Sequence, residues 1–305
     1  MIFGKNPPTI EDMTTHPRRF GVLVLPDADA PTLLDRFRRV EELGFDQLFL
    51  PDHIGNIFAT EPPWLDGWTM TTAAALVTER LRVGTLVSNP ILRPPALLAK
   101  EALTVDQLSG GRLELGIGTG IMESDHHATG TEPWTAKERI SRYPEYVRVL
   151  DEVLRRDGGP YTFEGDWYTV RDLPTGPPAS QRPRPPLIVG GQSPAVLRVA
   201  AERADIWNTN GRPDASVDEN VALATGWSRR VDEFAEQAGR DPATLRKSVL
   251  LWASTDVLTG PATLEELVDR YAAAGFTEFV IGWPGTDAEH ELFRRLAQET
   301  VPKLR

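Results

Sequence analysis

The chain has 305 residues, a formal net charge of −11 at pH 7 and no cysteine. The absence of cysteine excludes disulfides, iron–sulfur clusters and thiol chemistry, and the acidic balance argues against a nucleic-acid-binding surface. No run approaches eighteen apolar residues and the first twenty residues lack the apolar core of a signal peptide, so we expect a cytoplasmic protein without a membrane partner.

Residues 1–18 are polar and contain proline, and we expect a loosely held tail there, followed by a single domain over residues 19–305. From residue 20 onward, short apolar runs alternate with amphipathic runs, which predicts strands and helices in turn. Gly44 suits the end of the first helix, because glycine tolerates a positive φ. In the first half of the chain, the predicted strands cover 20–26, 45–50, 81–87 and 112–117, and the predicted helices cover 31–43, 64–79, 94–108 and 135–156.

The second half of the chain continues the alternation. Leu264, Leu267, Val268 and Tyr271 follow the i, i+3, i+4, i+7 spacing of one helical face. The predicted strands cover 187–189, 205–208, 247–253 and 276–281, and the predicted helices cover 194–203, 217–238, 262–274 and a terminal stretch ending near residue 296.

This alternation gives eight strand–helix units, which predict a parallel sheet of the α/β class. The segments EELGFDQLFLP (41–51) and AAAGFTEFVIGWP (272–284) repeat one helix–Gly–Phe–strand module near the two ends of the chain. That repeat favours a closed (β/α)8 TIM barrel, a fold that typically needs about 250 residues. A doubly wound open sheet is the competing architecture, but no clear linker divides the chain into halves.

Residues 160–186 interrupt the alternation. The run YTFEGDWYTV (161–170) predicts a hairpin around Glu164 and Gly165, and six prolines follow between Pro174 and Pro186. Because proline cannot donate to a strand ladder, we expect this segment to be an insertion outside the barrel wall. A linker between two domains is the alternative interpretation.

Asp52 and His53 directly follow the second predicted strand, at the end of a parallel barrel where ligands bind. A histidine there can exchange a proton with a substrate near neutral pH, and the adjacent carboxylate can set its tautomer. The alternative is that Asp52 caps the next segment and His53 is an ordinary surface residue.

Two glycine-rich segments follow later strands at the same end. Gly118, Thr119 and Gly120 come after the fourth strand, and glycines allow backbone N–H groups to approach an anion or a ring closely. The run 190–193, Gly-Gly-Gln-Ser, opens a helix whose free N–H groups favour a phosphate. Tight barrel turns and a simple Ser193 N-cap before Pro194 explain the same residues without a ligand.

Three runs carry a family resemblance: RVGTLVSN (82–89), PALLAKEALTVDQLSGGRLELGIGTG (95–120) and PPLIVGGQSP (185–194). With these runs the chain resembles the bacterial-luciferase-like superfamily of flavin and deazaflavin oxidoreductases, from about residue 20 to residue 207. The run 81–120 is most similar to the deazaflavin branch, whose members use coenzyme F420. Luciferase-like proteins also carry insertions of the kind expected at 160–186.

The resemblance implies roles for individual residues. It implies that His53 is catalytic, as a proton donor or hydride-stabilising partner near the reactive edge of the cofactor. Several deazaflavin relatives have a non-prolyl cis peptide at the position of Leu86–Val87, which nothing in the local sequence indicates. The implied cofactor-binding residues are Asp52, Leu86, Val87, Asn89, Gly118, Thr119, Gly120, His126, Gly190, Gly191, Gln192 and Ser193.

Ile121 departs from the family pattern. Many relatives carry a tryptophan at this position, and a sugar-phosphate-oxidising deazaflavin branch carries a glutamate that serves as its acid. An isoleucine cannot move a proton, so that role does not transfer to this chain. Glu123 and Asp125 lie nearby, but a solvated loop explains both carboxylates equally well.

Two further groups of residues invite a functional interpretation. His126 and His127 are adjacent, yet neither an i, i+4 histidine pair nor an HExxH run is present, so we expect no metal site. His126 stands where relatives often have a tyrosine near the cofactor, which favours a contact to the cofactor tail. Four tryptophans could line a pocket for a planar substrate or simply pack the fold: Trp64, Trp68, Trp134 and Trp207.

The leading hypothesis is therefore an oxidoreductase that transfers a hydride between coenzyme F420 and a small organic substrate. The alternative in the same fold is a reduced-FMN-dependent monooxygenase, which differs because a deazaflavin does not readily activate oxygen. A barrel that stores a cofactor or binds none is a third hypothesis, supported by the departure at Ile121. We expect a small molecule as the partner, with no nucleic acid, and a homodimer as the assembly to test.

Overall fold

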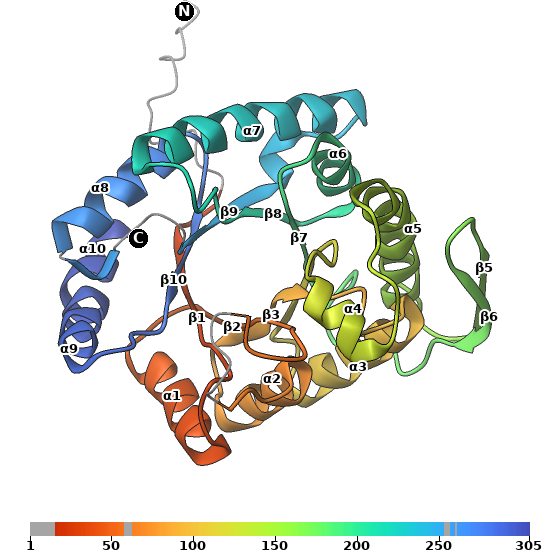
Figure 1. The fold of residues 1–305 in the computed structure, drawn as a ribbon, viewed down its shortest axis with the longest axis horizontal. Helices are drawn as coiled ribbons and strands as arrows, with labels where there is room; N and C mark the ends of the chain where they lie inside the picture. Colours follow the sequence, from red (N-terminus) through yellow and green to blue (C-terminus); the bar gives the residue numbers. More distant parts are fainter. Residues whose placement is uncertain (1–15, 58–62, 253–256, 260) are drawn as a thin grey trace, which may run out of the picture.

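Eight parallel strands close into a barrel in the order β1–β10–β9–β8–β7–β4–β3–β2 (Figure 1). The computed structural model describes residues 16–57, 63–252, 257–259 and 261–305. The predicted TIM barrel is thereby confirmed, and an open sheet is excluded. The barrel strands are β1 (Arg19–Leu23), β2 (Gln47–Leu50), β3 (Arg82–Ser88), β4 (Leu113–Ile117), β7 (Leu187–Gly190), β8 (Ile206–Thr209), β9 (Arg246–Leu251) and β10 (Glu278–Gly282).

Helices form a ring around the barrel (Figure 1). Several begin at capping residues: Thr135, Ser216 and Thr286 each form a capping box with a glutamate three residues later. None of the helices among the described residues is long and apolar enough to span a membrane. The helices are α1 (Ala30–Glu42), α2 (Gly67–Val77), α3 (Pro95–Leu108), α4 (Glu123–Thr129), α5 (Ala136–Leu154), α6 (Pro194–Arg203), α7 (Val217–Gln237), α8 (Pro261–Ala272), α9 (Asp287–Arg295) and α10 (Val301–Leu304).

Strand β1 closes the ring because it pairs with β10 on one side and with β2 on the other. The repeated Gly-Phe modules lead into these two flanking strands. Gly44 and Gly275 adopt φ values of +82° and +89°, so each glycine ends its helix in the left-handed region that disfavours other residues. The internal repeat therefore forms the same local structure on both sides of β1: a helix that ends at a glycine and is followed by a strand.

The barrel interior is filled in two layers of different chemistry. An apolar layer joins side chains from most of the strands: Leu23, Phe49, Leu86, Ile188, Ile206, Leu250 and Val280. Towards the N-terminal ends of the strands, Gln47 donates to Glu114 (2.8 Å) and to Glu278 (3.0 Å). Arg82 and Arg246 pair with these two carboxylates. This polar layer fills the barrel near the N-terminal ends of the strands, and the C-terminal ends are where TIM barrels bind their ligands.

The proline-rich insertion lies outside the barrel wall, as predicted. Strands β5 (Pro160–Glu164) and β6 (Thr169–Pro174) form an antiparallel hairpin apart from the barrel, beside α5 (Figure 1). The chain then returns along the barrel, where the buried Arg184 binds Asp151 and Asp205. The returning segment is thus anchored by ion pairs rather than by a strand ladder.

Some predicted boundaries were wrong. Helix α4 lies where only a loop and isolated carboxylates were expected, and the last helical stretch continues past residue 296 to Leu304 through a π-helical turn. Most other ends shift by one to three residues, since helix ends depend on capping contacts. Of the predicted tail, residues 1–15 lie outside the described residues, while Arg18 donates to the carbonyl of Leu304 (3.1 Å).

Candidate active site

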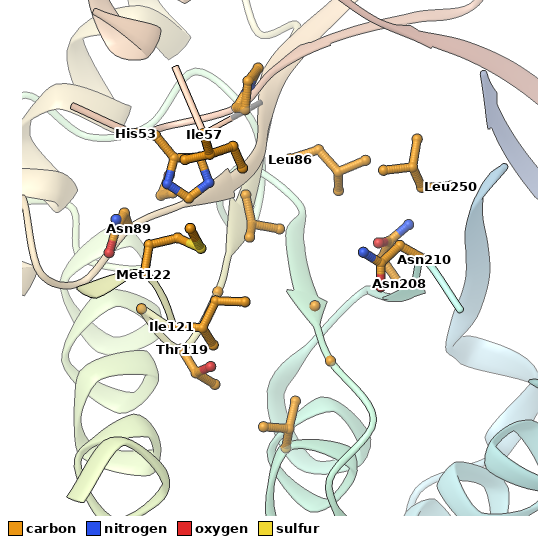
Figure 2. Close-up of a pocket in the computed structure, with 18 of the residues that line it drawn as sticks. His53, Ile57, Leu86, Asn89, Thr119, Ile121, Met122, Asn208, Asn210 and Leu250 are labelled. Carbon is orange, nitrogen blue, oxygen red and sulfur yellow. The ribbon is translucent and has the colours of Figure 1, made fainter. Parts of the chain in front are cut away.

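A cavity of about 540 Å³ opens at the C-terminal ends of the barrel strands. Eleven of the thirteen predicted site residues line it: His53, Leu86, Val87, Asn89, Gly118, Thr119, Gly120, Gly190, Gly191, Gln192 and Ser193. Figure 2 shows His53, Ile57 and Met122 gathered on one side of this cavity, with Asn208 and Asn210 on the other. The loops of distant strands therefore converge on one space, which the sequence analysis required of a cofactor site.

His53 is held by a carboxylate that the sequence analysis did not assign to it. Nδ1 of His53 donates to Oδ2 of Asp125 at 2.8 Å, and Asp125 is completely buried at the start of α4. Oδ1 of Asp125 accepts from the backbone N–H of Ile54 (3.0 Å), and Oδ2 also accepts from Asn89 Nδ2 (2.7 Å). With Nδ1 engaged, Nε2 is the ring nitrogen left for the cavity.

The electrostatics of Asp125 support this assignment. Burial raises the pKa of its carboxyl, but the hydrogen bonds from His53, the Ile54 backbone and Asn89 outweigh burial and lower the pKa below its ordinary value. Asp125 is therefore ionised at neutral pH and accepts the Nδ1 proton. This arrangement fixes the tautomer of His53 and the orientation of its ring.

Asp52, predicted to orient His53 and to contact the cofactor, does not bind His53 and is not among the lining residues of the cavity. Its carboxylate is completely buried and binds Arg93 (3.2 Å) and the backbone N–H of Asn89 (3.0 Å). Burial raises the pKa of Asp52 despite the opposing charge of Arg93. Arg93 also binds Asp66 (2.6 Å) and Glu101 (3.0 Å). Asp52 therefore anchors the loop that carries Asn89. It does not bind His53, because the side chains of adjacent residues in an extended chain point in opposite directions.

The irregular end of β3 is packed closely against glycines of the neighbouring strands. The Leu86–Val87 peptide is cis, and the pairing of β3 with β4 shifts register between Thr85 and Ser88. The Val87 side chain lies against Gly118 and Gly190, where an added Cβ would approach Val87 carbons to 2.5 Å and 3.1 Å. These two glycines are thus required for close packing, a constraint that exists without any bound anion.

The N-terminus of α6 has features that are typical of an anion-binding site. Ser193 caps the helix by accepting from the Val196 N–H (3.4 Å), and Pro194 occupies the first helical position. Gly191 adopts a φ of +135°, a value that side chains rarely allow, and its carbonyl accepts from Trp207 (2.8 Å). Gln192 donates to Thr209 (3.0 Å), which ties this turn to the end of β8.

Several residues with a predicted role lie elsewhere. His126 is buried behind the cavity wall, with its ring on Thr131 (3.0 Å) and on the backbone of Trp134 (3.3 Å), so the expected contact to a cofactor tail is not supported. Asn89 lines the cavity, but its amide oxygen accepts from the Ile91 N–H and its nitrogen binds Asp125. None of the four tryptophans named as candidates is among the lining residues: Trp64, Trp68, Trp134 and Trp207.

Other lining residues of the cavity were not predicted from the sequence. Trp252 contributes an aromatic ring after β9, and Asn208 and Asn210 contribute amides at the end of β8. Asn208 had a recognisable signal in the sequence, because it is a polar residue at the end of the predicted strand 205–208. Asp125 had no comparable signal, because its partner His53 is 72 residues away in the sequence.

The chain is similar in sequence to a known family and to individual proteins. The model of the luciferase-like monooxygenase family matches residues 11–300. An F420-dependent glucose-6-phosphate dehydrogenase from Microbacterium testaceum is 28% identical over 95% of this chain and 98% of its own length. An FMNH2-dependent dimethylsulfone monooxygenase from Pseudomonas putida is 31% identical over 60% of this chain and 51% of its own length.

A solved structure shares the fold at low sequence identity. An F420-dependent secondary alcohol dehydrogenase, in complex with an F420–acetone adduct, superimposes with a TM-score of 0.81 at 20% identity. The match covers 95% of this chain and all of that one. At this identity the likeness supports the barrel architecture and its chain order.

Proposed function

The chain belongs to the luciferase-like monooxygenase family, and from that membership we propose that it transfers a hydride between coenzyme F420 and a small organic substrate. The observation that carries the proposal is the His53–Asp125 pair, which holds one oriented imidazole at the cavity. The choice of F420 is supported by the F420-dependent relative, which aligns along nearly the whole chain, whereas the FMN-dependent relative aligns along part of it.

The lining residues fit a deazaflavin. Leu86, Val87 and Leu250 offer an apolar surface for a planar ring, and the glycines of the β4 and β7 loops keep that surface accessible. The ten-residue helix α6 begins at the cavity edge, and its first N–H groups, which lack partners within the helix, favour the phosphate of the cofactor tail. When bound, coenzyme F420 supplies the site that gives or accepts the hydride.

The chain's own contribution is proton transfer and orientation. With Nδ1 of His53 donating to Asp125, Nε2 is placed to give a proton to a substrate oxygen or nitrogen, or to remove one. Asn89 and the Ile54 backbone hold Asp125 in turn, so the imidazole is fixed by three loops rather than one. We therefore assign His53 as the acid–base residue and Asp125 as its positioning residue.

Anaerobic turnover is the test of this proposal. Reduced F420 should be oxidised by the enzyme in the presence of small carbonyl or alkene compounds with oxygen excluded, because hydride transfer consumes no oxygen. The FMN-dependent alternative predicts the opposite pattern. Substrate conversion with reduced FMN that stops when oxygen is removed, together with no conversion with reduced F420, would replace the proposal with a monooxygenase.

A further inference from the structure

We infer that the substrate is an uncharged, mostly apolar compound and that phosphorylated and carboxylated compounds are excluded. This inference rests on the proposed function and adds the substrate class to it. The inferred substrate class differs from that of the relative from Microbacterium testaceum, whose name gives glucose 6-phosphate, a sugar phosphate, as its substrate.

The described cavity wall contains a single ionisable side chain, that of His53. Its other polar groups are neutral amides and hydroxyls, and its apolar part includes Ile57, Ile121, Met122 and Trp252. An anion that enters such a space loses its hydration without gaining a charged partner, which is costly. An apolar compound gains free energy there instead, since the wall removes its surface from water.

Arginines close in sequence to lining residues of the cavity contact other groups of the protein. Arg212, beside the lining residues of the β8 loop, forms a two-point ion pair with Asp214 at 2.5 and 3.1 Å. Arg139 donates to the carbonyl of Trp134 (3.1 Å), and Arg142 stacks on the rings of Trp134 and Trp167. The Arg93 guanidinium is taken up by Asp52, Asp66 and Glu101.

The sequence adds no cation directly after the lining residues Ile57 and Trp252. The residues that follow them outside the described part of the chain, 58–62 and 253–256, include Glu61 and Asp256 but neither lysine nor arginine. The net charge of −11 adds a repulsive field for an approaching anion. The start of α6 is the feature that favours an anion, and the proposed function uses it for the cofactor phosphate.

A matched pair of probes tests the inference directly. The F420-loaded enzyme is titrated calorimetrically with methyl 4-oxocyclohexanecarboxylate and with the corresponding free carboxylate, and separately with glucose 6-phosphate. We expect the neutral ester to bind at least about tenfold more tightly than the carboxylate, and the sugar phosphate to show no binding. Equal or tighter binding of either anion overturns the inference, and so does a failure of the ester to bind.

A lysine introduced at the cavity edge provides a second test of the inference. Ile121 is 64% exposed at the cavity edge, so Ile121→Lys should fold. The added cation should reduce the ratio of ester affinity to carboxylate affinity by up to about fivefold. Leu76→Lys, at a 62% exposed position on α2, adds the same charge away from the cavity and should leave the preference unchanged. An unchanged preference in Ile121→Lys, or an equal change in Leu76→Lys, contradicts the inference.

Arg212 requires its own control because it is exposed and could release Asp214. Arg212→Ala should leave the affinities of ester and carboxylate within about twofold of the unsubstituted enzyme. Weaker carboxylate binding in this variant would reveal Arg212 as an anion receptor and overturn the inference. Failure of F420 itself to bind would instead count against the proposed function, and the probe pair could then be measured on the FMN-loaded protein.

Discussion

Nδ1 of His53 lies 2.8 Å from Oδ2 of Asp125, although 72 residues separate them in the sequence. His53 follows β2 and Asp125 lies in the helix that follows β4, while Asn89, which also binds Asp125, follows the intervening strand β3. Three consecutive strands of the barrel thus deliver an imidazole, an amide and a carboxylate to one point. The pair requires only that these three neighbouring strands lie side by side, and it fixes which nitrogen of His53 faces the cavity.

His53→Ala should lower kcat by about 10²–10⁴-fold, because it removes the acid–base group, while the Kd for F420 should change only a few-fold. Steady-state kinetics and a cofactor titration on the same preparation measure both quantities. His53→Gln, which keeps a polar side chain but cannot exchange a proton, should be equally impaired. A kcat within a few-fold of the unsubstituted enzyme would limit His53 to packing.

Asp125→Asn should lower kcat by about 10- to 10³-fold with little loss of cofactor affinity, since an amide can donate to Nδ1 and favours the wrong tautomer. The loss should fall on kcat and leave the KM for the substrate nearly unchanged, because His53 stays in place and only its orientation and tautomer change. Glu123→Gln removes a carboxylate from an exposed position of the same helix and should leave kcat unchanged. Identical behaviour of the two variants would refute a positioning role.

The lowered pKa of Asp125 predicts a pH-dependent stability difference. Burial raises this pKa, but hydrogen bonds from His53, the Ile54 backbone and Asn89 lower it below the ordinary 3.8. A carboxyl whose pKa is lower in the folded state stabilises the fold above its unfolded pKa, and this contribution disappears as the pH falls through the folded pKa. The difference in unfolding free energy between the unsubstituted protein and Asp125→Asn, measured by urea denaturation, should therefore shrink between about pH 5 and about pH 2. A difference in unfolding free energy that does not change with pH would contradict a lowered pKa of Asp125.

Gly118→Ala should destabilise the fold by about 1–3 kcal/mol, because its Cβ would lie 2.5 Å from Val87 Cγ2. Thermal unfolding gives the measurement, and Gly226→Ala is the matched control. The added Cβ at Gly226 meets open space on α7, so that variant should be neutral or more stable by up to about 1 kcal/mol. In a Val87→Ala background the cost of Gly118→Ala should fall; equal costs in both backgrounds would show that Val87 is not the cause.

The sequence predicted the barrel well because strand–helix alternation is a local property. Each of the eight predicted strands overlaps a barrel strand, and His53, Asn89 and the two glycine-rich segments reach the cavity because each directly follows a strand. Position at the end of a strand is enough to place a residue at the barrel mouth. The errors at helix ends and at α4 arise where capping and tertiary contacts, rather than periodicity, decide the conformation.

The pairing of side chains could not be read in the same way. Asp52 was the obvious carboxylate for His53 because the two are adjacent, but neighbours on an extended chain point apart, and Asp52 instead binds Arg93. His126 is buried on α4 beside Asp125, but its ring contacts Thr131 and the backbone of Trp134 and does not line the cavity. Partners separated by tens of residues are set by the three-dimensional arrangement of loops, which periodicity does not encode.

Cofactor binding is the most direct measurement of the central claim. Isothermal titration of the purified protein with oxidised F420 and with oxidised FMN compares the two candidates under one set of conditions, and Ser193→Asp in the cap of α6 serves as a probe of the phosphate site. We predict micromolar or tighter binding of F420, much weaker binding of FMN, and a loss of F420 affinity of at least about tenfold in Ser193→Asp, because the new carboxylate competes for the helix N-terminus. Micromolar binding of FMN with no detectable binding of F420 would contradict the account.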